Sequence, residues 1–479
     1  PDGTSTAVPP VEFWGDFVYK VASQYKGRVS RWVIWNQPDI TDPASANHTW
    51  DGTEEDYFRL LKEAYLKIKT VDPTMQVHVA GLTYTWDQRQ GTPQYLARLL
   101  DVIAQDPDAA ANNYYFDAVG YHIYYDPRQL LQILPDVRAI LDSRGLADKA
   151  IWIDETNAPP SEDFIEPPNG TPPFKISLEE QSAFVVQAFS LALAGGAERI
   201  AFNKLRNERG HPDSVVPLGL LRGDDSRRPA FESFRTASTY FADVEQAQWQ
   251  QVGDVVVVTL IRTGQTTTVV WNVGRTPTPF NLPAIAGQAL LVNDQGATET
   301  ISAVNGQYSL QLPAAACTNG DYCFIGGAPW LVVEAGQPAA RELAPQPEPT
   351  APPPPPTSTP PPAPTATPLP LPPTLTPVAT PTAAEVAVAT APPPNSGPPP
   401  AILPDTPPQG QVLPDSEADP FAPAASSIPA DEAFATPVPP VSARTILRPD
   451  RLLWLFVIGL IVFTVAYGIQ LTIWNRFKR

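Results

Sequence analysis

Five short apolar runs in the first half of the chain are each followed at once by polar or aromatic residues. These residues are Asn36 and Gln37, Tyr84 and Trp86, His122 and Tyr124, Glu155 and Asn157, and Asn203 and Lys204. Glu155 offers a carboxylate, whereas Gln37 offers an amide, which neither releases nor recovers a proton near neutral pH. A carboxylate, an imidazole, a phenol and amides repeated at comparable positions are typical of a binding or catalytic site.

Helix-period segments alternate with these apolar runs and would position the polar residues. Helices are predicted at 11–25, 54–69, 95–104, 130–143 and 178–194, and strands at 31–35, 76–82, 116–125, 150–156 and 199–205. Such alternation predicts a parallel sheet in the α/β class. No Gly-x-Gly-x-x-Gly or P-loop follows any strand, which argues against a nucleotide-binding form. Polar residues at the carboxyl ends of successive strands favour a (β/α)8 TIM barrel, which we place at residues 1–240.

Three of the strand ends carry longer motifs. Residues 35–38 read Trp-Asn-Gln-Pro, which is similar to the Trp-Asn-Glu-Pro that ends the fourth strand in retaining glycoside hydrolases of clan A, including families 5 and 39. Residues 152–157, Trp-Ile-Asp-Glu-Thr-Asn, look like the seventh-strand segment that carries the nucleophile of this clan. Residues 120–124, Gly-Tyr-His-Ile-Tyr, resemble the sixth-strand segment that faces the sugar. The three motifs follow one another in the order of the clan.

This resemblance implies a role for each matching residue. Glu155 would be the nucleophile, and Gln37 would occupy the position of the acid/base. Asn36 would hydrogen-bond the sugar 2-hydroxyl, and His122 and Tyr124 would position Glu155 and the sugar. The alternatives are a solvated loop glutamate for Glu155 and a core histidine bonded to backbone for His122.

Further ligand contacts are predicted around these residues. Trp50 and Trp86 lie in or near the loops after the first two predicted strands, where flat rings stack on sugars, with packing in the core as the alternative. Asn157 is a further substrate-binding candidate. The last strand lacks the tryptophan that many clan members place there, and Lys204 and Arg206 are candidates for contact with an acidic sugar.

The amide at position 37 leaves the activity open. Retaining hydrolysis uses two carboxyl groups about 5 Å apart, one to protonate the departing oxygen and one to attack the anomeric carbon. The chain could be a catalytically inactive carbohydrate-binding protein, or an enzyme for substrates whose leaving group needs no proton. In a third alternative Asp39 or Asp42 acts in place of Gln37, or Gln37 is a variant within an active line. A purely structural surface protein would leave the site vestigial.

The resemblance also limits how much of a barrel is present. If residue 35 ends a fourth strand, only strands four to eight lie in this chain, and three strands are missing. A parallel barrel without them would expose hydrogen-bonding edges and an apolar interior. The chain begins with Pro1 rather than Met, and we expect it to be the C-terminal part of a longer protein.

Residues 244–336 change character. Runs at 255–262, 266–273, 289–292, 298–303, 307–312 and 330–334 predict strands of an antiparallel β-sandwich that accompanies the barrel. Cys317 and Cys323 flank a turn-rich segment and are predicted to form a disulfide, as in exported proteins; two unpaired thiols are the alternative.

The C-terminal third predicts a stalk and a membrane anchor. More than half of the 60 prolines fall within residues 337–450, which we expect to be a disordered, Pro/Thr-rich spacer. Residues 452–474 are apolar with Trp454 and Trp474 at the ends, as in a transmembrane helix, and 475–479 would be a short cytoplasmic tail. The expected location is a single-pass membrane protein with extracellular N-terminal domains.

The overall charge and the remaining residue types restrict the partners. A net charge of -18 argues against nucleic acid. Four histidines and two cysteines show no metal-ligand spacing, so no metal and no cofactor is predicted. The expected partners are a carbohydrate and, through the C-terminal helix, a membrane; the sequence gives no prediction of oligomeric state.

Overall fold

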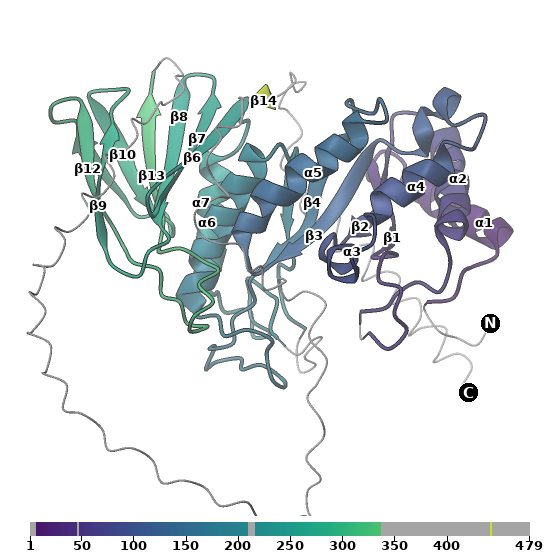
Figure 1. The fold of residues 1–479 in the computed structure, drawn as a ribbon, viewed down its shortest axis with the longest axis horizontal. Coiled ribbons are helices and arrows are strands. Elements are labelled where there is room, and N and C mark those ends of the chain that lie inside the picture. The colour runs from purple at the N-terminus through teal and green to yellow at the C-terminus, as the bar shows by residue number, and fades with distance from the viewer. Residues whose placement is uncertain (1–5, 46, 209–215, 337–440, 443–479) are drawn as a thin grey trace, which may run out of the picture. The chain divides into compact units, whose positions relative to one another are not determined.

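The computed structural model describes residues 6–45, 47–208, 216–336 and 441–442, and five parallel strands pair in chain order within it (Figure 1). These strands are β1 (Arg31–Asn36), β2 (Gln76–Leu82), β3 (Ala118–Tyr124), β4 (Ala150–Asn157) and β5 (Arg199–Phe202). Sequential order is the arrangement of a (β/α)8 barrel, because a doubly wound sheet reverses its strand order. The region therefore forms part of a barrel, as the sequence predicted.

The helices lie between the strands and close to the predicted positions. They are α1 (Val11–Gln24), α2 (Glu54–Val71), α3 (Thr85–Gln90), α4 (Tyr95–Ile103), α5 (Leu130–Asp142), α6 (Leu178–Ala194) and α7 (Pro229–Tyr240), with 3₁₀ turns η1 (Ala110–Tyr115) and η2 (Pro127–Gln129). Two of them begin at capping boxes, formed by Thr53 with Asp56 and by Ser177 with Glu180. Such caps satisfy backbone N–H groups that have no partner within the helix, so the local sequence fixes where α2 and α6 start.

One side of the barrel region is not fully covered by the described residues. Within them β1 and β5 are the edges of the parallel sheet. Val33 on β1 is 45% exposed, and Phe13 on α1 is 74% exposed. By contrast, every residue of β3 is buried. Apolar side chains are thus exposed at this edge of the parallel sheet, whereas its central strand is buried.

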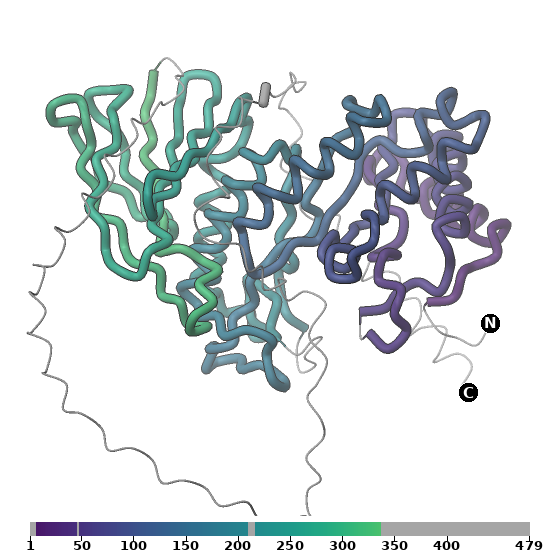
Figure 2. Tube along the Cα trace, viewed as in Figure 1, coloured from purple at the N-terminus to yellow at the C-terminus, as the bar shows by residue number. Residues whose placement is uncertain are grey.

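An antiparallel region follows α7, and the trace enters it after the barrel part (Figure 2). Its strands are β6 (Gln246–Val252), β7 (Val255–Arg262), β8 (Gln265–Asn272), β9 (Thr278–Pro283), β10 (Gln288–Asn293), β11 (Thr298–Ser302), β12 (Gln307–Leu312) and β13 (Trp330–Ala335). Strands β9 and β12 form a two-stranded sheet, and the others join a seven-stranded sheet. Side chains from both sheets share one apolar core, as in the predicted sandwich. At the β11–β12 turn, Asn305 and Gly306 both have positive φ (+52° and +75°), as a tight hairpin requires.

The seventh strand of the larger sheet comes from within the range 337–450 that is predicted as a spacer. Strand β14 (Val441–Ser442) lies inside that range and pairs antiparallel with β6. The other residues predicted as stalk, the predicted transmembrane span 452–474 and the predicted tail 475–479 lie outside the described residues. Within the part of the chain that the structure describes, no helix has the length and apolar character needed to cross a membrane.

Helix α6 connects the barrel part to the antiparallel region and is buried on nearly all sides. The amide of Gln187 contacts the second region with both ends: Nε2 donates to Gly327 O, and Oε1 accepts from Gly326 N, both at 3.0 Å. Ser182 Oγ donates to Asp294 Oδ2 at 2.8 Å. A helix that is buried all round must lie between two packed layers, and here its polar side chains find their partners in the second layer.

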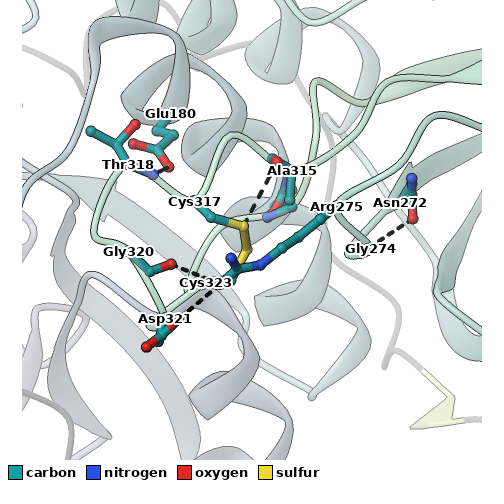
Figure 3. The surroundings of a disulfide bond; sticks show 12 residues. Glu180, Asn272, Gly274, Arg275, Ala315, Cys317, Thr318, Gly320, Asp321 and Cys323 are labelled. Carbon is teal, nitrogen blue, oxygen red and sulfur yellow. Dashed lines mark hydrogen bonds and ion pairs between the residues drawn. A yellow bond between two sulfur atoms is a disulfide. The ribbon is translucent and has the colours of Figure 1, made fainter.

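The predicted disulfide between Cys317 and Cys323 is present (Figure 3). Inside the loop that it closes, Thr318 N donates to Glu180 Oε1 on α6 at 3.0 Å. Arg275 Nη2 donates to Gly320 O at 2.7 Å. The crosslink therefore holds a loop that contacts both α6 and the connection between β8 and β9.

Candidate active site

The strand ends that carry the polar residues have unusual backbone conformations. Trp35 and Gln37 have φ values of +75° and +45°, and Tyr84 and Tyr125 have φ values of +54° and +66°. Positive φ is uncommon outside glycine, and such residues cluster at functional sites. The four positions follow or end β1, β2 and β3, so the chain turns sharply at the same edge of the sheet each time.

Glu155, at the end of β4, has a side chain that is 33% exposed. Its Oε2 accepts hydrogen bonds from Tyr124 Oη at 2.8 Å and from Asn203 Nδ2 at 3.1 Å. Asn203 Nδ2 also donates to Tyr124 Oη at 2.7 Å. Burial raises the pKa of Tyr124 well above its usual range, so the phenol stays protonated and donates a hydrogen bond to Glu155. Two donors thus hold one carboxylate oxygen of an accessible glutamate.

Gln37 and Glu155 approach the same ring nitrogen of His122. Gln37 is 4% exposed, and its Nε2 lies 2.8 Å from His122 Nδ1. His122 Nδ1 is in turn 3.5 Å from Glu155 Oε2. The distance between Gln37 Nε2 and Glu155 Oε2 is therefore at most the sum of these two distances. The separation of about 5 to 5.5 Å between the two carboxyl groups of retaining enzymes falls within that limit.

The structure also brings Asp154, which the sequence analysis did not select, to this cluster. Its Oδ1 lies 3.5 Å from His122 Nε2, so the imidazole stands between Asp154 and Glu155. Burial raises the pKa of Asp154 to about 6. Asn203, which contacts Glu155, was noted at a strand end but was not assigned to the site. Two glycines inside strands, Gly81 and Gly120, were the available signal, since an isolated strand glycine marks a close approach.

Of the two tryptophans predicted to contact sugar, Trp50 is a core residue, and that prediction is wrong. It is 1% exposed, and its ring packs edge-on against Trp35 and Tyr57 with centroids 5.1 and 6.2 Å away. A Cβ at residue 52 would lie 2.5 Å from the Trp50 ring, so Gly52 leaves the room that this packing needs. The ring therefore has no free face for a sugar.

Trp86 is 9% exposed and lines a cavity of about 520 Å³ beside α3. The cavity is also lined by Thr41, Asp42, Gln90, Thr92 and Arg98, among others, and Gln37, His122 and Glu155 are not part of its wall. Asn36, by contrast, is exposed at the end of β1 next to Gln37. A contact of Asn36 or Trp86 with sugar stays a prediction.

Asn157 is buried and acts within the protein, which corrects its prediction as a substrate contact. Its Nδ2 donates to Asn203 O at 2.6 Å and to Leu218 O at 2.7 Å. Its Oδ1 accepts from Gln181 Nε2 at 3.1 Å. With both ends of the amide engaged and no exposed surface, Asn157 ties β4 to the segment after β5 and so supports Asn203.

Of the two alternative proton donors, Asp39 cannot reach a ligand. It has no exposed surface, and its Oδ2 accepts from the backbone N and the Oγ1 of Thr83, both at 2.7 Å. Burial raises its pKa to about 6. Asp42 is half-buried on the wall of the Trp86 cavity, and its Oδ1 accepts from Ala44 N at 2.9 Å. The structure therefore rejects the first alternative and places the second outside the Gln37–Glu155 cluster.

The two cations predicted to meet an acidic sugar lie after β5. Burial lowers the pKa of Lys204 from its usual value. Arg206 Nη1 donates to Asp225 Oδ1 at 2.8 Å, in a pair whose side chains are both 43% exposed. The described residues contain no group of three or more His, Cys, Asp or Glu side chains arranged to hold a metal ion.

Comparison with known proteins gives one sequence relative. No protein-family model matches the chain. A β-xylosidase from Caldicellulosiruptor saccharolyticus is 35% identical over 82 residues, which make up 16% of this chain and 16% of that protein. The chain therefore matches only a small part of the length of this relative.

The similarity to solved structures covers a larger part of this chain. A family 39 glycoside hydrolase from Bacteroides cellulosilyticus WH2 is 17% identical with a TM-score of 0.50, and the match covers 70% of this chain and 65% of that one. A glucosidase from Croceicoccus marinus is 14% identical with a TM-score of 0.48, covering 70% and 77%. The chain thus spans less than two thirds of the family 39 structure. At these identities the first similarity establishes the fold, and this is the fold that the resemblance of the three motifs implied.

Proposed function

We propose that this chain, whose fold is that of the clan A glycoside hydrolases, binds carbohydrate at the carboxyl end of its parallel strands and keeps Glu155 as a nucleophile. The observation that carries the proposal is the arrangement of Glu155. It is a partly exposed carboxylate with Oε2 held by Tyr124 and Asn203, and it shares Nδ1 of His122 with the residue in the acid/base position. Donors on one oxygen orient a carboxylate for attack at the anomeric carbon.

Gln37 restricts which sugars could be cleaved. General acid catalysis contributes typically 10² to 10⁴ in rate, and an amide cannot supply it. Glycosides with a poor leaving group therefore stay bound and are turned over very slowly. Glycosides whose leaving group departs as a stable anion can still transfer the sugar to Glu155. The protein is then a carbohydrate-binding protein with a residual retaining activity that requires an activated substrate.

A second candidate function is binding without any turnover. The burial of Gln37 and its contact with His122 favour it, because a side chain that is 4% exposed has little freedom to take part in catalysis. Both candidates use the same site, and they differ only in whether Glu155 reacts.

Activated xylosides and glucosides are suitable probes because the relatives named above are a xylosidase and a glucosidase. We expect 2,4-dinitrophenyl glycosides to be hydrolysed and xylobiose to remain intact. A 2-deoxy-2-fluoro sugar with the same leaving group should label Glu155, as mass spectrometry of the digested protein would show. Binding without any labelling would leave only the second candidate, and an absence of both binding and labelling would reject both.

We also propose that residues 452–474 anchor the protein in a membrane with the N-terminal domains outside. The apolar stretch with tryptophan at each end, the proline-rich segment before it and the disulfide between Cys317 and Cys323 support this arrangement. Protease added to intact cells should remove the N-terminal domains and leave the C-terminal tail protected. Release of the whole chain by carbonate washing would contradict the anchor.

A further inference from the structure

Asp154 and His122 form a pair that two glycines make possible. A Cβ on Gly81 would lie 1.9 Å from His122 Nε2, and a Cβ on Gly120 would lie 2.1 Å from Asp154 Oδ2. Heavy atoms cannot approach so closely, so any side chain at either position would displace one member of the pair. Glycine in β2 and glycine in β3 therefore leave the space that the imidazole of His122 and the carboxylate of Asp154 occupy.

The contact between Gln37 and His122 fixes the direction of a hydrogen bond. The amide nitrogen of Gln37 carries two hydrogens and no free lone pair, so at 2.8 Å from Nδ1 it must donate. Nδ1 therefore accepts, and the proton of a neutral imidazole sits on Nε2. That is the nitrogen that Asp154 Oδ1 faces at 3.5 Å. A carboxylate at this place favours the tautomer with hydrogen on Nε2.

The orientation of the Gln37 amide follows from that tautomer. With its nitrogen bound to His122, the amide turns its carbonyl oxygen away from the imidazole. In a retaining glycosidase this residue faces the oxygen on the anomeric carbon. A carbonyl oxygen can accept a hydrogen bond from an anomeric hydroxyl. It cannot bond the oxygen of a glycosidic ether, which has no hydrogen to donate.

We infer that Asp154 is a positioning residue that acts through His122 to present the Gln37 carbonyl, so that the site selects reducing sugars with a free anomeric hydroxyl over glycosides. This inference rests on the proposed sugar site and specifies its ligand. Glu155 competes less for the imidazole proton, because its Oε2 already accepts from Tyr124 and Asn203, whereas the buried Asp154 Oδ1 accepts from no other donor among the described residues. An unpaired acceptor facing an ether oxygen weakens binding by about tenfold.

The test is calorimetric titration of the purified protein with xylose and with methyl β-xyloside, and with glucose and methyl β-glucoside. The wild type should bind each free sugar about tenfold more tightly than its methyl glycoside. In Asp154→Asn the new amide can donate to Nε2, which places the proton on Nδ1 and turns the Gln37 amide round. The preference should then disappear or reverse. The control Asp101→Asn removes the same charge from a side chain that is 69% exposed, and its ratio should equal that of the wild type.

Nitrogen NMR gives a readout that a purely structural role of Asp154 would not change. The chain has four histidines, and His122 is assigned by loss of its signals in His122→Gln. The wild type should show the Nε2–H tautomer at His122, and Asp154→Asn the Nδ1–H tautomer. If Asp154→Asn does not fold, Gln37→Leu offers a second variant, because it has no carbonyl to present and should bind both members of each sugar pair equally.

The outcomes separate this inference from the proposed function. Equal affinity of the wild type for free sugars and glycosides, or an unchanged ratio in Asp154→Asn, would overturn the selection of reducing sugars and leave the sugar site in place. Binding of neither class by the wild type would reject the sugar site itself and this inference with it.

Discussion

In the proposed function the ends of β1 and β4 carry the two positions that a retaining glycosidase needs, and these two ends differ in exposure, chemistry and contacts. At the end of β4, Glu155 is 33% exposed and is held by two donors from neighbouring strand ends. At the end of β1, Gln37 is 4% exposed, cannot titrate and is bonded to an imidazole. The position proposed for the nucleophile thus has a carboxylate with supporting contacts, whereas the position proposed for the proton donor has an amide.

Under the proposed function, this difference means that a site can lose one catalytic role without losing its shape. The loop after β1 still brings Gln37 over the sheet edge with the same kind of positive-φ turns that follow β2 and β3. The supporting side chains of Glu155 come from β3 and from the end of β5, so they do not depend on Gln37. The proposed nucleophile is therefore supported independently of the residue at position 37.

Replacing Glu155 should have the largest effect on turnover, because it removes the proposed nucleophile at the end of β4. In Glu155→Gln we expect turnover of dinitrophenyl glycosides to fall by about 10³-fold or more, because no other side chain can form the covalent intermediate. Steady-state release of dinitrophenolate measures it. Glu162→Gln, on the exposed part of the following loop, is the matched control and should behave as the wild type. Equal rates in Glu155→Gln and wild type would remove Glu155 from the nucleophile position.

Restoring a carboxyl group at Gln37 should make the two strand ends equivalent. In Gln37→Glu we expect hydrolysis of xylobiose to rise by about 10² to 10⁴. Release of dinitrophenolate in the first step should change little, whereas its steady-state turnover should rise, because the new carboxylate acts as general base in the second step. Azide should speed turnover of activated substrates by the wild type, because an anionic nucleophile needs no general base, and should lose this effect in the variant. Gln24→Glu on the exposed end of α1 is the control. Background rates on xylobiose in Gln37→Glu would show that a missing proton donor is not the reason for inactivity.

The pH dependence of stability at Asp39, two residues beyond Gln37, tests whether the end of β1 is buried. Burial raises its pKa from 3.8 to about 6, so the folded state holds a proton that the unfolded state has already lost. Its contribution to stability is complete below pH 3.8 and is lost as the pH rises through about 6, by roughly 3 kcal/mol. In Asp39→Asn this loss should vanish, while the amide can still accept from Thr83. Urea unfolding of both proteins between pH 4 and 7 measures the difference, and parallel curves would contradict it.

Tyr124→Phe removes one of the two donors to Glu155 and should have the smallest effect. Loss of a hydrogen bond to a charged group weakens the orientation of the carboxylate by about 1.5 kcal/mol, which corresponds to about tenfold slower turnover of activated substrates. Tyr19→Phe on α1, where the ring is 46% exposed, controls for loss of a phenol. An unchanged rate in Tyr124→Phe would mean that Asn203 alone fixes Glu155.

The sequence predicted most of the fold because the elements have strong periodic patterns. All five parallel strands and the helices that precede them appear close to the predicted residues. Strand β9 was missed because it contains two prolines, Pro279 and Pro283, which argue against a strand. Strand β6 was missed because it is rich in glutamine, and α7 was missed because Pro229 at its first position is its main start signal.

The site was predicted less completely, because it depends on contacts between strands. Asp154 and Glu155 are neighbours in β4, and the two-residue period of a strand places them on opposite faces. Both nevertheless approach His122, because the pairing register of β3 with β4 shifts between Tyr121 and His122. Trp50 was predicted to contact sugar because the sequence indicates that it lies in a loop. The sequence does not indicate that its ring packs against Trp35.

The amide of Gln187 has a practical consequence for anyone who divides this protein. Its two hydrogen bonds cross from α6 to Gly326 and Gly327, and Ser182 does the same with Asp294. Expressed by itself, the parallel-sheet half would expose these polar groups together with the apolar surface of α6. Heating or denaturant should therefore melt both halves in a single cooperative transition, and shortened versions that end after α7 should be insoluble.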